Sequence, residues 1–565
     1  MLFGSLKKIV KPLFLVGLVT IATAIAIYTV SVNQAVIKNE DKLSYIISAK
    51  DFDLLLLKIA ELDVVPSHDL AIIKSVAVTL SESQLAKLKQ SIDIKVSLNH
   101  EVELSNWGSR QRSNRPDAEV ADHIDASVAH SYYNFGDGVT IGFLDTGLDQ
   151  LYGLSTDLYG YDKAWGTYDA ITDTVYNYAA EFSGHGTHVA SIATNSDFDT
   201  QGRIFGVAPN AAIVGIKAFD QMGKATYADV IRGIDWAVQV KDLINLRVLN
   251  MSFSGTVQSN YWDDPLNLAV MKAWQEGLVV VASAGNTGPD PMTIGVPGNV
   301  PYIITVGAMT DDYTPEVMND DKLASFSSAG PTYEGFVKPE IVAPGGHLPG
   351  LMSFDTQIAY DHPEYHDGGR YFQMSGTSQA AAVVSGVVAL MLTEQPWLTP
   401  DEVKCRLMDG ARLATTNNSE LAYSVFQQGA GVVNAADSLA SVASNCANTD
   451  LDINKDLAGI QHYAGSANVN EDGDFYVEGL GDEYVWQVTE EFNSDVGHAW
   501  GADMEVDIFI WNSNLDVDIF IWNSSFWADI FIAENTLATD IFIWNSTLGF
   551  NLNASIAVNN WVEQQ

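Results

Sequence analysis

The chain has few cysteines and few basic residues, and both shortages exclude classes of function. Cys405 and Cys446 are the only cysteines among 565 residues, too few for a disulfide-rich scaffold or a cysteine-based zinc site. One disulfide between them remains open in an oxidising compartment. Lys and Arg number 29 against 71 Asp and Glu, which gives a formal net charge of −42. Because nucleic acids and anionic membranes bind clustered Lys and Arg, we expect neither as a main partner.

An uncharged apolar run near the N-terminus extends from Pro12 to Val30 and follows a cluster of three lysines. This order predicts a secretory signal peptide or a membrane anchor over residues 1–35. The run of 19 residues is long for a signal peptide, just long enough to span a bilayer, and not followed by a clean cleavage site. Both interpretations therefore stay open. Either one sends the rest of the chain outward, so we expect an extracellular or cell-surface protein.

Composition divides the rest of the chain into four parts. Residues 36–105 form a small mixed segment in which alternating strand-like runs flank "SESQLAKLKQSI", where Ser81 and Gln84 have the spacing of a helix capping box. Residues 106–120 are polar and Arg-rich without an apolar period, which predicts an exposed, cleavable linker. Residues 121–446 and 447–565 form two further domains with very different patterns.

Short apolar strands alternate with helical runs throughout residues 121–446, as in "GVTIGFLD", "THVASIATN", "AAIVGIKAF" and "YADVIRGIDWAVQV". This order predicts an α/β fold in which helices cover both faces of a parallel sheet. In such sheets, reactive groups gather beyond the carboxyl ends of the strands. Asp145 closes one of these strands and is therefore a candidate site residue.

Four glycine-rich motifs in this region place polar residues at strand or helix ends. They are "FLDTG" with Asp145, "GHGTHVA" with His185 and His188, "SAGN" with Asn286, and "SGTSQAA" with Ser378. Each residue taken alone could be structural. In this order and at this spacing, however, the motifs resemble those of subtilisin-like serine proteases. The resemblance implies a subtilisin-like fold and a serine endopeptidase.

The resemblance also implies a role for each of these residues. Ser378 would attack the peptide carbonyl, His185 would take up and return the proton, and Asp145 would orient the histidine and stabilise its charged form. Asn286 and the Ser378 backbone N–H would bind the oxyanion, and no cofactor is expected for catalysis. His188 would be a supporting residue. A metal site built on the H-x-x-H pair is the alternative, but the sequence offers it no evident third ligand.

A substrate cleft with extended strand edges is implied by the same resemblance, with small residues that let a peptide pair with the backbone. Seven residues are assigned to it, three on each of two facing edges and one at the base of the first pocket: Ser252, Phe253 and Ser254; Gly223, Lys224 and Ala225; and Gly295. Because that base carries no acidic group, we expect a roomy pocket for large apolar side chains.

The chain departs from the family pattern at two places. Gln379 stands directly after the nucleophile, where many members carry methionine. The calcium loops of the family do not align cleanly either. The resemblance makes structural calcium expected, and "TNSDFDTQG" offers Asp197 and Asp199, but the ligands are not assigned. "DLDINKD", from Asp450 to Asp456, is either the start of a calcium loop or an acidic linker.

The N-terminal segment, residues 36–105, is similar to the inhibitory propeptides of this family. Such a propeptide would assist the folding of a parallel-sheet domain whose many non-local contacts slow folding. It would also cover the cleft until it is cut. An ordinary small structural domain is the alternative.

The acidic tail, residues 447–565, has 21 Asp and Glu against the single basic residue Lys455. Four eleven-residue units within residues 506–549 each place an aspartate before Ile-Phe-Ile, at Asp507, Asp518, Asp529 and Asp540. This pattern predicts strands and turns in a β-rich repeat domain. The domain would either pack on the protease as an accessory or mediate cell-surface binding or self-association.

Together these patterns predict a secreted or surface-held serine endopeptidase that hydrolyses protein or peptide substrates and processes itself from a proenzyme. Its own propeptide would be its inhibitor. The competing hypothesis is a non-catalytic adhesion or assembly protein that retains a protease scaffold. The complete set of Asp145, His185, Ser378 and Asn286 argues against that hypothesis.

Overall fold

A computed structural model describes residues 42–104, 107–108, 118–311, 321–415, 421–481, 484–487, 499–500, 520–524 and 542–546. The predicted signal or anchor over residues 1–35 lies outside the described residues. So do most of the predicted linker and most of the eleven-residue repeats.

The largest sheet has the strand order β16-β15-β14-β12-β7-β10-β8-β9, and β17 also pairs with β15. Seven strands run parallel: β7 (Thr140–Asp145), β8 (Ala164–Asp169), β10 (Ala212–Lys217), β12 (Leu246–Met251), β14 (Val279–Ser283), β15 (Ile304–Thr310) and β17 (Ile341–Pro344). The antiparallel strands β9 (Thr174–Tyr176) and β16 (Lys322–Leu323) pair with β8 and β15. The predicted α/β fold is therefore confirmed, with a mixed but mostly parallel sheet.

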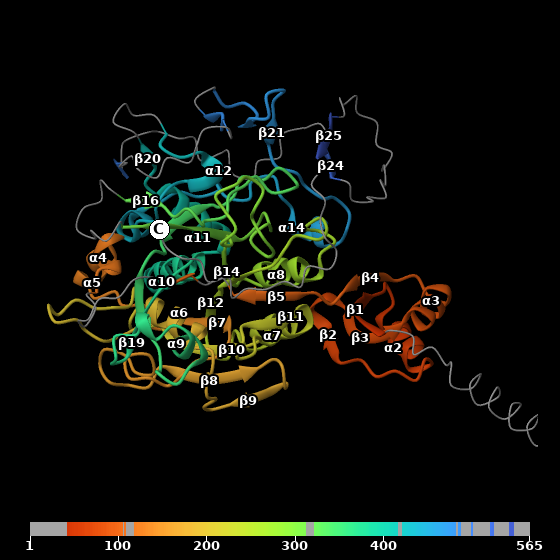
Figure 1. Cartoon of the computed structure of the whole chain (residues 1–565), viewed down its shortest axis with the longest axis horizontal. Coiled ribbons are helices and arrows are strands. Elements are labelled where there is room, and N and C mark those ends of the chain that lie inside the picture. The colour runs from red at the N-terminus through yellow and green to blue at the C-terminus, as the bar shows by residue number, and fades with distance from the viewer. Residues whose placement is uncertain are drawn as a thin grey trace, which may run out of the picture.

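Long helices flank this sheet (Figure 1). The helices α6 (His185–Thr194) and α10 (Thr377–Glu394) pack together on one side of the central strands. On the other side, α7 (Tyr227–Val240) packs against α8 (Pro265–Gln275). Of the helices in the described part of the chain, α10 has the length and apolar composition of a membrane span, but 89% of it is buried inside the protein. It is the central helix of the core, which explains its lack of a polar face.

The unit predicted to be catalytic, called the catalytic region below, contains further short elements. They are α4 (Val120–His123), α5 (Ala126–Ser131), β18 (Leu348–Leu351), α9 (Gln357–Asp361), β19 (Tyr371–Ser375), α11 (Pro400–Asp409), β20 (Ala414–Thr415), α12 (Val425–Gln428), α13 (Ala435–Ala440) and β23 (Ala499–Trp500).

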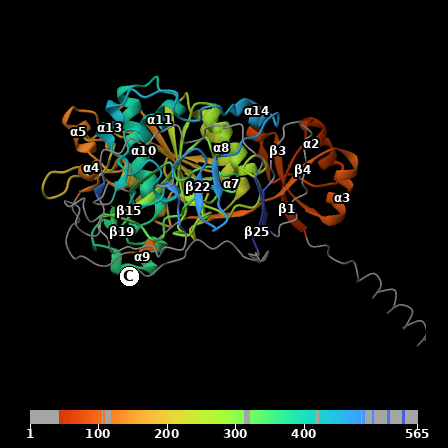
Figure 2. The ribbon, with the colours of Figure 1, turned by 90° about the horizontal axis from the view of Figure 1, so that it is seen from above.

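The N-terminal unit, residues 42–104, has its own apolar core and lies beside the helices α7 and α8 (Figures 1 and 2). Its antiparallel sheet has the order β2-β3-β1-β4, from β1 (Lys42–Ser48), β2 (His68–Leu70), β3 (Ser75–Ser81) and β4 (Lys95–Leu98). The helices α2 (Phe52–Ala60) and α3 (Glu82–Ser91) complete it. The predicted capping box is confirmed, because Gln84 N donates to Ser81 Oγ at 3.3 Å and Ser81 N donates to the Gln84 side chain at 3.0 Å.

The chain that leaves this unit forms two strands with the catalytic region. β5 (Glu101–Leu104) lies between β11 (Lys224–Thr226) and β13 (Phe253–Ser254) and pairs antiparallel with both. Next, β6 (Trp107–Gly108) pairs antiparallel with β19, which also pairs with β18. The same segment therefore contacts strands on both sides of the residues predicted to be catalytic.

The predicted domain boundary at residues 446 and 447 does not coincide with a break in packing. Beyond it, α14 (Ile453–Leu457), β21 (Ala467–Val469) and β22 (Phe475–Val477) follow, and Tyr463 and Phe475 join the main core. Asp456 accepts hydrogen bonds from the buried hydroxyls of Tyr261 at 2.6 Å and Tyr302 at 3.0 Å. The catalytic core therefore extends at least to Trp486, whose ring packs on Phe426. The composition showed where the chain becomes acidic, but it did not reveal these buried contacts with the catalytic core.

Two structural features bear on predictions that the sequence left open. Cys405 and Cys446 form a disulfide, with their Cα atoms 5.3 Å apart. In the repeats, β24 (Phe520–Ser524) and β25 (Phe542–Ser546) pair in parallel, so that Phe520 lies opposite Phe542, two repeat units further on. The five described residues of each unit form a strand, and the β-rich repeat domain as a whole stays a prediction.

Candidate active site

Asp145 and His185 are joined by a buried hydrogen bond. Asp145 ends the central strand β7, and His185 is the first residue of α6. The distance from His185 Nδ1 to Asp145 Oδ1 is 2.7 Å, and neither side chain is exposed. His185 Nε2 has no hydrogen-bond partner among the described residues. With Nδ1 protonated and held by Asp145, Nε2 is the nitrogen that can accept a proton.

Glycines on either side of His185 permit this close contact between the start of α6 and the end of β7. Gly184 has a φ of +99°, a conformation that residues with a Cβ rarely adopt. A Cβ on Gly186 would overlap the carbonyl oxygen of Gly147, directly after the Asp145 loop. The G-H-G sequence therefore lets the start of α6 lie against the end of β7.

Ser378 is the second residue of α10 and is completely buried. Its hydroxyl donates to the Ser252 carbonyl oxygen at 3.0 Å, and the Ser252 hydroxyl donates to the Ser378 carbonyl oxygen at 2.9 Å. Because α10 packs along α6, Gln379 Nε2 comes within 3.4 Å of His188 Nδ1. The nucleophile candidate and the base candidate thus lie at the starts of two helices in contact.

His188 has a supporting role, as predicted. Its Nε2 donates to the Phe372 carbonyl oxygen at 2.9 Å, and its Nδ1 faces the Gln379 amide. Burial lowers the pKa of His188 to about 3, so the ring is neutral. Both ring nitrogens of His188 therefore face protein groups in this structure.

Asn286 lies where its amide can act as a hydrogen-bond donor. Its Oδ1 accepts hydrogen bonds from the backbone N–H of Thr377 at 3.0 Å and from the Thr377 hydroxyl at 2.8 Å. This fixes the amide orientation and leaves the buried Nδ2 without a partner in the described structure. An unpartnered buried donor is costly unless it meets an acceptor during function. Sequence reasoning missed Thr377, although it directly precedes Ser378.

A second residue missed by sequence reasoning is Glu181, a buried carboxylate before α6. It accepts hydrogen bonds from the backbone N–H groups of Ser183 at 2.8 Å and Gly184 at 2.7 Å, and from the hydroxyls of Thr146 at 2.9 Å and Thr187 at 3.0 Å. Thr146 Oγ1 in turn accepts the Gly186 N–H at 3.0 Å. Glu181 therefore ties the Asp145 loop to the helix that begins with His185. Burial raises the pKa of Glu181 to about 7.

The predicted substrate-binding residues lie together around β5. Lys224 and Ala225 belong to β11, Phe253 and Ser254 form β13, and Ser252 contacts Ser378. The remaining two, Gly223 and Gly295, are positioned by tight geometry. Gly223 has a φ of +72° in the turn before β11, and a Cβ on Gly295 would overlap the Ser254 hydroxyl. The assigned roles of all seven residues stay predictions.

The carboxylates that the sequence offered for calcium, without assigning them, have protein partners. Asp452 caps α14 by accepting from the backbone N–H groups of Asn454 and Lys455, and Asp456 accepts from Tyr261 and Tyr302. Within the described residues, no group of three or more His, Cys, Asp and Glu side chains is arranged to hold a metal ion. Asp197 and Asp199 also have protein partners, which are described below.

Comparison with known proteins agrees with this geometry. A model described as "Subtilase family" matches residues 136–431, more than half of the chain. The chain belongs to the subtilase family. Serine protease AprX of Bacillus subtilis (strain 168) is 36% identical over 327 residues, which cover 57% of this subtilase and 71% of that protein. Subtilisin DY of Bacillus licheniformis is 34% identical over 278 residues, 49% of this subtilase and 84% of that protein.

A solved structure shares the fold of this subtilase. Fervidolysin from Fervidobacterium pennivorans, described as a keratinolytic enzyme related to subtilisin, superimposes with a TM-score of 0.56 at 22% identity. The match covers 71% of this chain and 61% of that one. At this identity the likeness concerns the fold alone. The family itself makes this subtilase a serine endopeptidase, and its substrates are proteins or peptides.

Proposed function

We propose that this subtilase is a secreted or surface-held proenzyme that uses Asp145, His185 and Ser378 as a catalytic triad and cuts its own chain next to β5. Ser378 Oγ attacks the carbonyl carbon, and His185 Nε2 takes the hydroxyl proton and returns it to the leaving amine. Asp145 holds Nδ1 and stabilises the charged ring. The open Nε2 of His185 and its 2.7 Å bond to Asp145 support these roles.

The oxyanion would be stabilised by Asn286 Nδ2 together with the backbone N–H of Ser378. Both donors are fixed before the substrate arrives, since Thr377 orients the Asn286 amide and Ser378 stands in the first turn of α10. Donors that need no reorganisation stabilise the developing charge most effectively.

One observation carries the self-cleavage proposal: the chain itself follows the path expected of a substrate. In the pairing register, Leu104 of β5 lies opposite Phe253, which adjoins Ser252. Trp107 of β6 lies opposite Ser375, three residues before Ser378. Extended peptides bind to proteases by strand pairing of this kind. The bond that is cut therefore lies between Leu104 and Trp107, at the start of the predicted linker.

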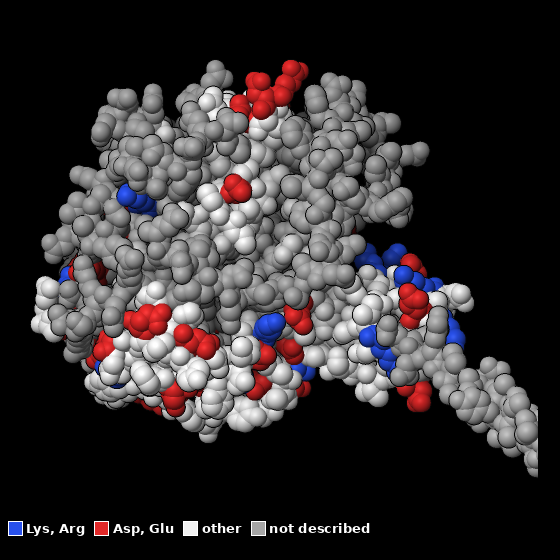
Figure 3. Space-filling model, in the orientation of Figure 1, with Lys and Arg blue, Asp and Glu red and all other residues white. Residues whose placement is uncertain are grey.

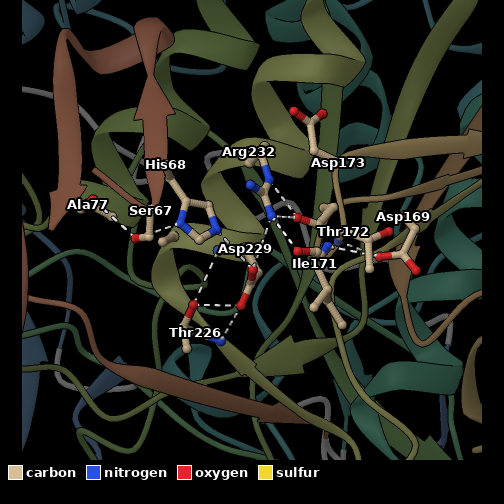
Figure 4. A network of polar contacts seen from close by, with 12 residues as sticks. Ser67, His68, Ala77, Asp169, Ile171, Thr172, Asp173, Thr226, Asp229 and Arg232 are labelled. Atoms are coloured by element: carbon tan, nitrogen blue, oxygen red, sulfur yellow. Dashed lines mark hydrogen bonds and ion pairs between the residues drawn. The ribbon is translucent and has the colours of Figure 1, made fainter. Parts of the chain in front are cut away.

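Additional contacts support an inhibitory role for residues 42–104. His68 Nε2 lies 3.0 Å from Asp229 Oδ1 on α7, and both side chains are nearly buried. Asp229 also forms the capping box of α7 with Thr226 and pairs with Arg232 at 3.5 Å (Figure 4). At the same helix start, the Tyr227 N–H donates to the His100 carbonyl oxygen at 2.7 Å. The N-terminal unit is thus fastened both at the cleft and on α7.

Charge also favours this association. Seven of the 29 basic residues lie within residues 42–104, and Figure 3 shows basic side chains gathered on this unit. The described surface of the catalytic region in the same view carries mainly acidic side chains. Opposite charge on the two parts favours their encounter and retention, and raised salt should weaken both.

The test is to purify the chain and Ser378→Ala and to determine the masses and N-termini of both. Ser378→Ala should stay uncut and fail to react with a fluorophosphonate. The parent should react, and its new N-terminus should lie between residues 105 and 107. Ser385→Ala is the matched control, because this buried serine lies on the same helix and donates to Asn250 instead. It should process normally.

Three outcomes would contradict the proposal. Processing of isolated Ser378→Ala would show that another protease matures the chain. A parent that neither reacts nor hydrolyses peptides would favour the non-catalytic adhesion hypothesis. A new N-terminus within residues 109–117 would show that the segment paired in the cleft is not the one that is cut.

The proposal extends to the tail, where the repeats would attach the enzyme to a surface or associate with one another. Support comes from β24 and β25, which have the same sequence, Phe-Ile-Trp-Asn-Ser, and pair in parallel with identical residues opposite each other. Strands that pair in this way can add further copies at their edges.

A further inference from the structure

The loop after α6, residues 195–206, contains Asp197 and Asp199, the two carboxylates that the sequence offered for calcium without assigning them. Asp199 in this loop has a side chain that is not exposed at all. Its Oδ1 accepts from the backbone N–H groups of Gln201 at 2.8 Å and Arg203 at 2.9 Å. Its Oδ2 accepts from Arg203 Nε at 2.8 Å and from the Ala118 N–H at 3.1 Å. Four donors therefore already surround this carboxylate.

The second candidate ligand, Asp197, is also engaged with a basic side chain. Its Oδ2 accepts from the Arg370 guanidinium and from the Tyr371 hydroxyl, the latter at 3.1 Å. Arg370 donates in addition to the Tyr152 carbonyl oxygen at 2.8 Å and lies over the Tyr152 ring at 5.7 Å. This arginine joins the loop to two neighbouring segments, much as a bound cation would.

A third basic side chain lies at the base of the same loop. Lys163 is only 6% exposed, and its Nζ donates to the carbonyl oxygens of Thr194, the last residue of α6, and Pro209. Carbonyl oxygens beside carboxylates are the donor set that calcium prefers. Here the Lys163 amine donates to the two carbonyl oxygens, and the guanidinium groups of Arg203 and Arg370 donate to the carboxylates.

The donor set of this loop therefore does not fit a calcium ion. A metal would have to displace Arg203 from a fully buried carboxylate and would lie close to the Arg370 guanidinium. Such displacement breaks an ion pair around a buried carboxylate, which is unfavourable. The composition supports the same conclusion. Only 29 residues are Lys or Arg in a chain with a net charge of −42, and three of these 29 lie around this one loop.

We propose that Lys163, Arg203 and Arg370 replace calcium in holding residues 195–206, so that this loop is stable without the metal. The function of the arrangement is to fix the C-terminal end of α6 and the start of the catalytic region. Ala118 donates to Asp199, and Glu119 lies 3.6 Å from Arg203. The loop thus keeps its fold where calcium is scarce.

The test is hydrogen exchange of full-length Ser378→Ala, read on the peptide that covers residues 195–206, in EDTA and in millimolar calcium. The amides of Gln201 and Arg203 report directly, because both donate to Asp199. Exchange in this peptide should be the same in both solutions. Because the readout is local, calcium bound elsewhere in the chain does not affect it, and the inactive background separates the result from the proposed catalysis.

The arginines are tested one at a time. Arg203→Gln and Arg370→Gln should each speed exchange in this peptide about tenfold or more, since a buried carboxylate loses a charged donor. Arg247→Gln is the control, because Arg247 donates to the carbonyl oxygens of Pro396 and Leu398, and it should leave the peptide unchanged. Slower exchange of the parent loop in calcium than in EDTA would overturn the proposal. So would unchanged exchange in both arginine variants.

Discussion

Glu181→Gln should change how the stability of the catalytic region depends on pH. Burial raises the pKa of Glu181 in the folded protein from its ordinary value of 4.5 to about 7. Between these two values the folded state holds the proton while the unfolded state has released it. Stability is therefore lost as pH rises through this window, and the loss is complete above about pH 7. At 1.36 kcal/mol for each pH unit, the effect is about 3 kcal/mol.

Glutamine cannot titrate, so the variant should lack this part of the pH dependence. Urea unfolding is measured at pH 5, 6, 7 and 8 in the Ser378→Ala background, which prevents self-digestion. The difference in free energy of unfolding, parent minus variant, should fall by about 3 kcal/mol between pH 5 and pH 8. The other ionisable groups titrate equally in both proteins, so their contributions cancel when the two free energies of unfolding are subtracted. A difference that stays constant within about 1 kcal/mol would refute the reasoning, because it would mean that Glu181 titrates near its ordinary value.

The same substitution should also reduce catalysis. Every hydrogen-bond partner found for Glu181 is a donor, and the amide nitrogen of glutamine cannot accept from any of them. The start of α6, and with it His185, should therefore shift, which lowers kcat about ten- to a hundredfold. Glu181→Ala is the comparison, since it removes the carboxylate without adding donors. Unchanged kcat in both variants would show that Glu181 does not position His185.

Three further predictions follow from the site and its surroundings. Asn286→Ala should lower kcat about 10²–10³-fold, a range that comes from subtilisin itself, with KM nearly unchanged; a change confined to KM would argue against oxyanion binding. Gln379→Met should make activity sensitive to mild peroxide, because methionine oxidises beside the nucleophile and glutamine does not; equal sensitivity of both proteins would place the oxidised residue elsewhere. A chain ending at residue 487 should keep peptide hydrolysis but lose surface association. A chain ending at residue 447 should have a free energy of unfolding lower by several kcal/mol, because loss of Asp456 leaves the hydroxyls of Tyr261 and Tyr302 without their acceptor. Thermal melts and small-peptide turnover of both truncations decide this, and equal stability would restore the boundary at residue 446.

The sequence by itself determined the features that short patterns encode. Alternating apolar strands and helices predicted the parallel sheet, which the structure shows. The capping box of Ser81 and Gln84 was readable because both partners lie within four residues. The order of the motifs with Asp145, His185, Asn286 and Ser378 predicted which elements meet, since parallel strands and the helices that follow them share one edge of the sheet.

Only the tertiary structure decided which distant residues are partners. The carboxylate of Glu181 resembles any acidic loop residue until the distant hydroxyl of Thr146 joins its local donors and ties it to the Asp145 loop. Asp197 gave no sign of its partner, because Arg370 lies 173 residues further along the chain. Asp456 looked like part of a linker, although it pairs with Tyr261, which is distant along the chain. The physical reason is the same in each case: the free energy of a buried polar group depends on partners that folding brings together, and composition or local spacing does not reveal them.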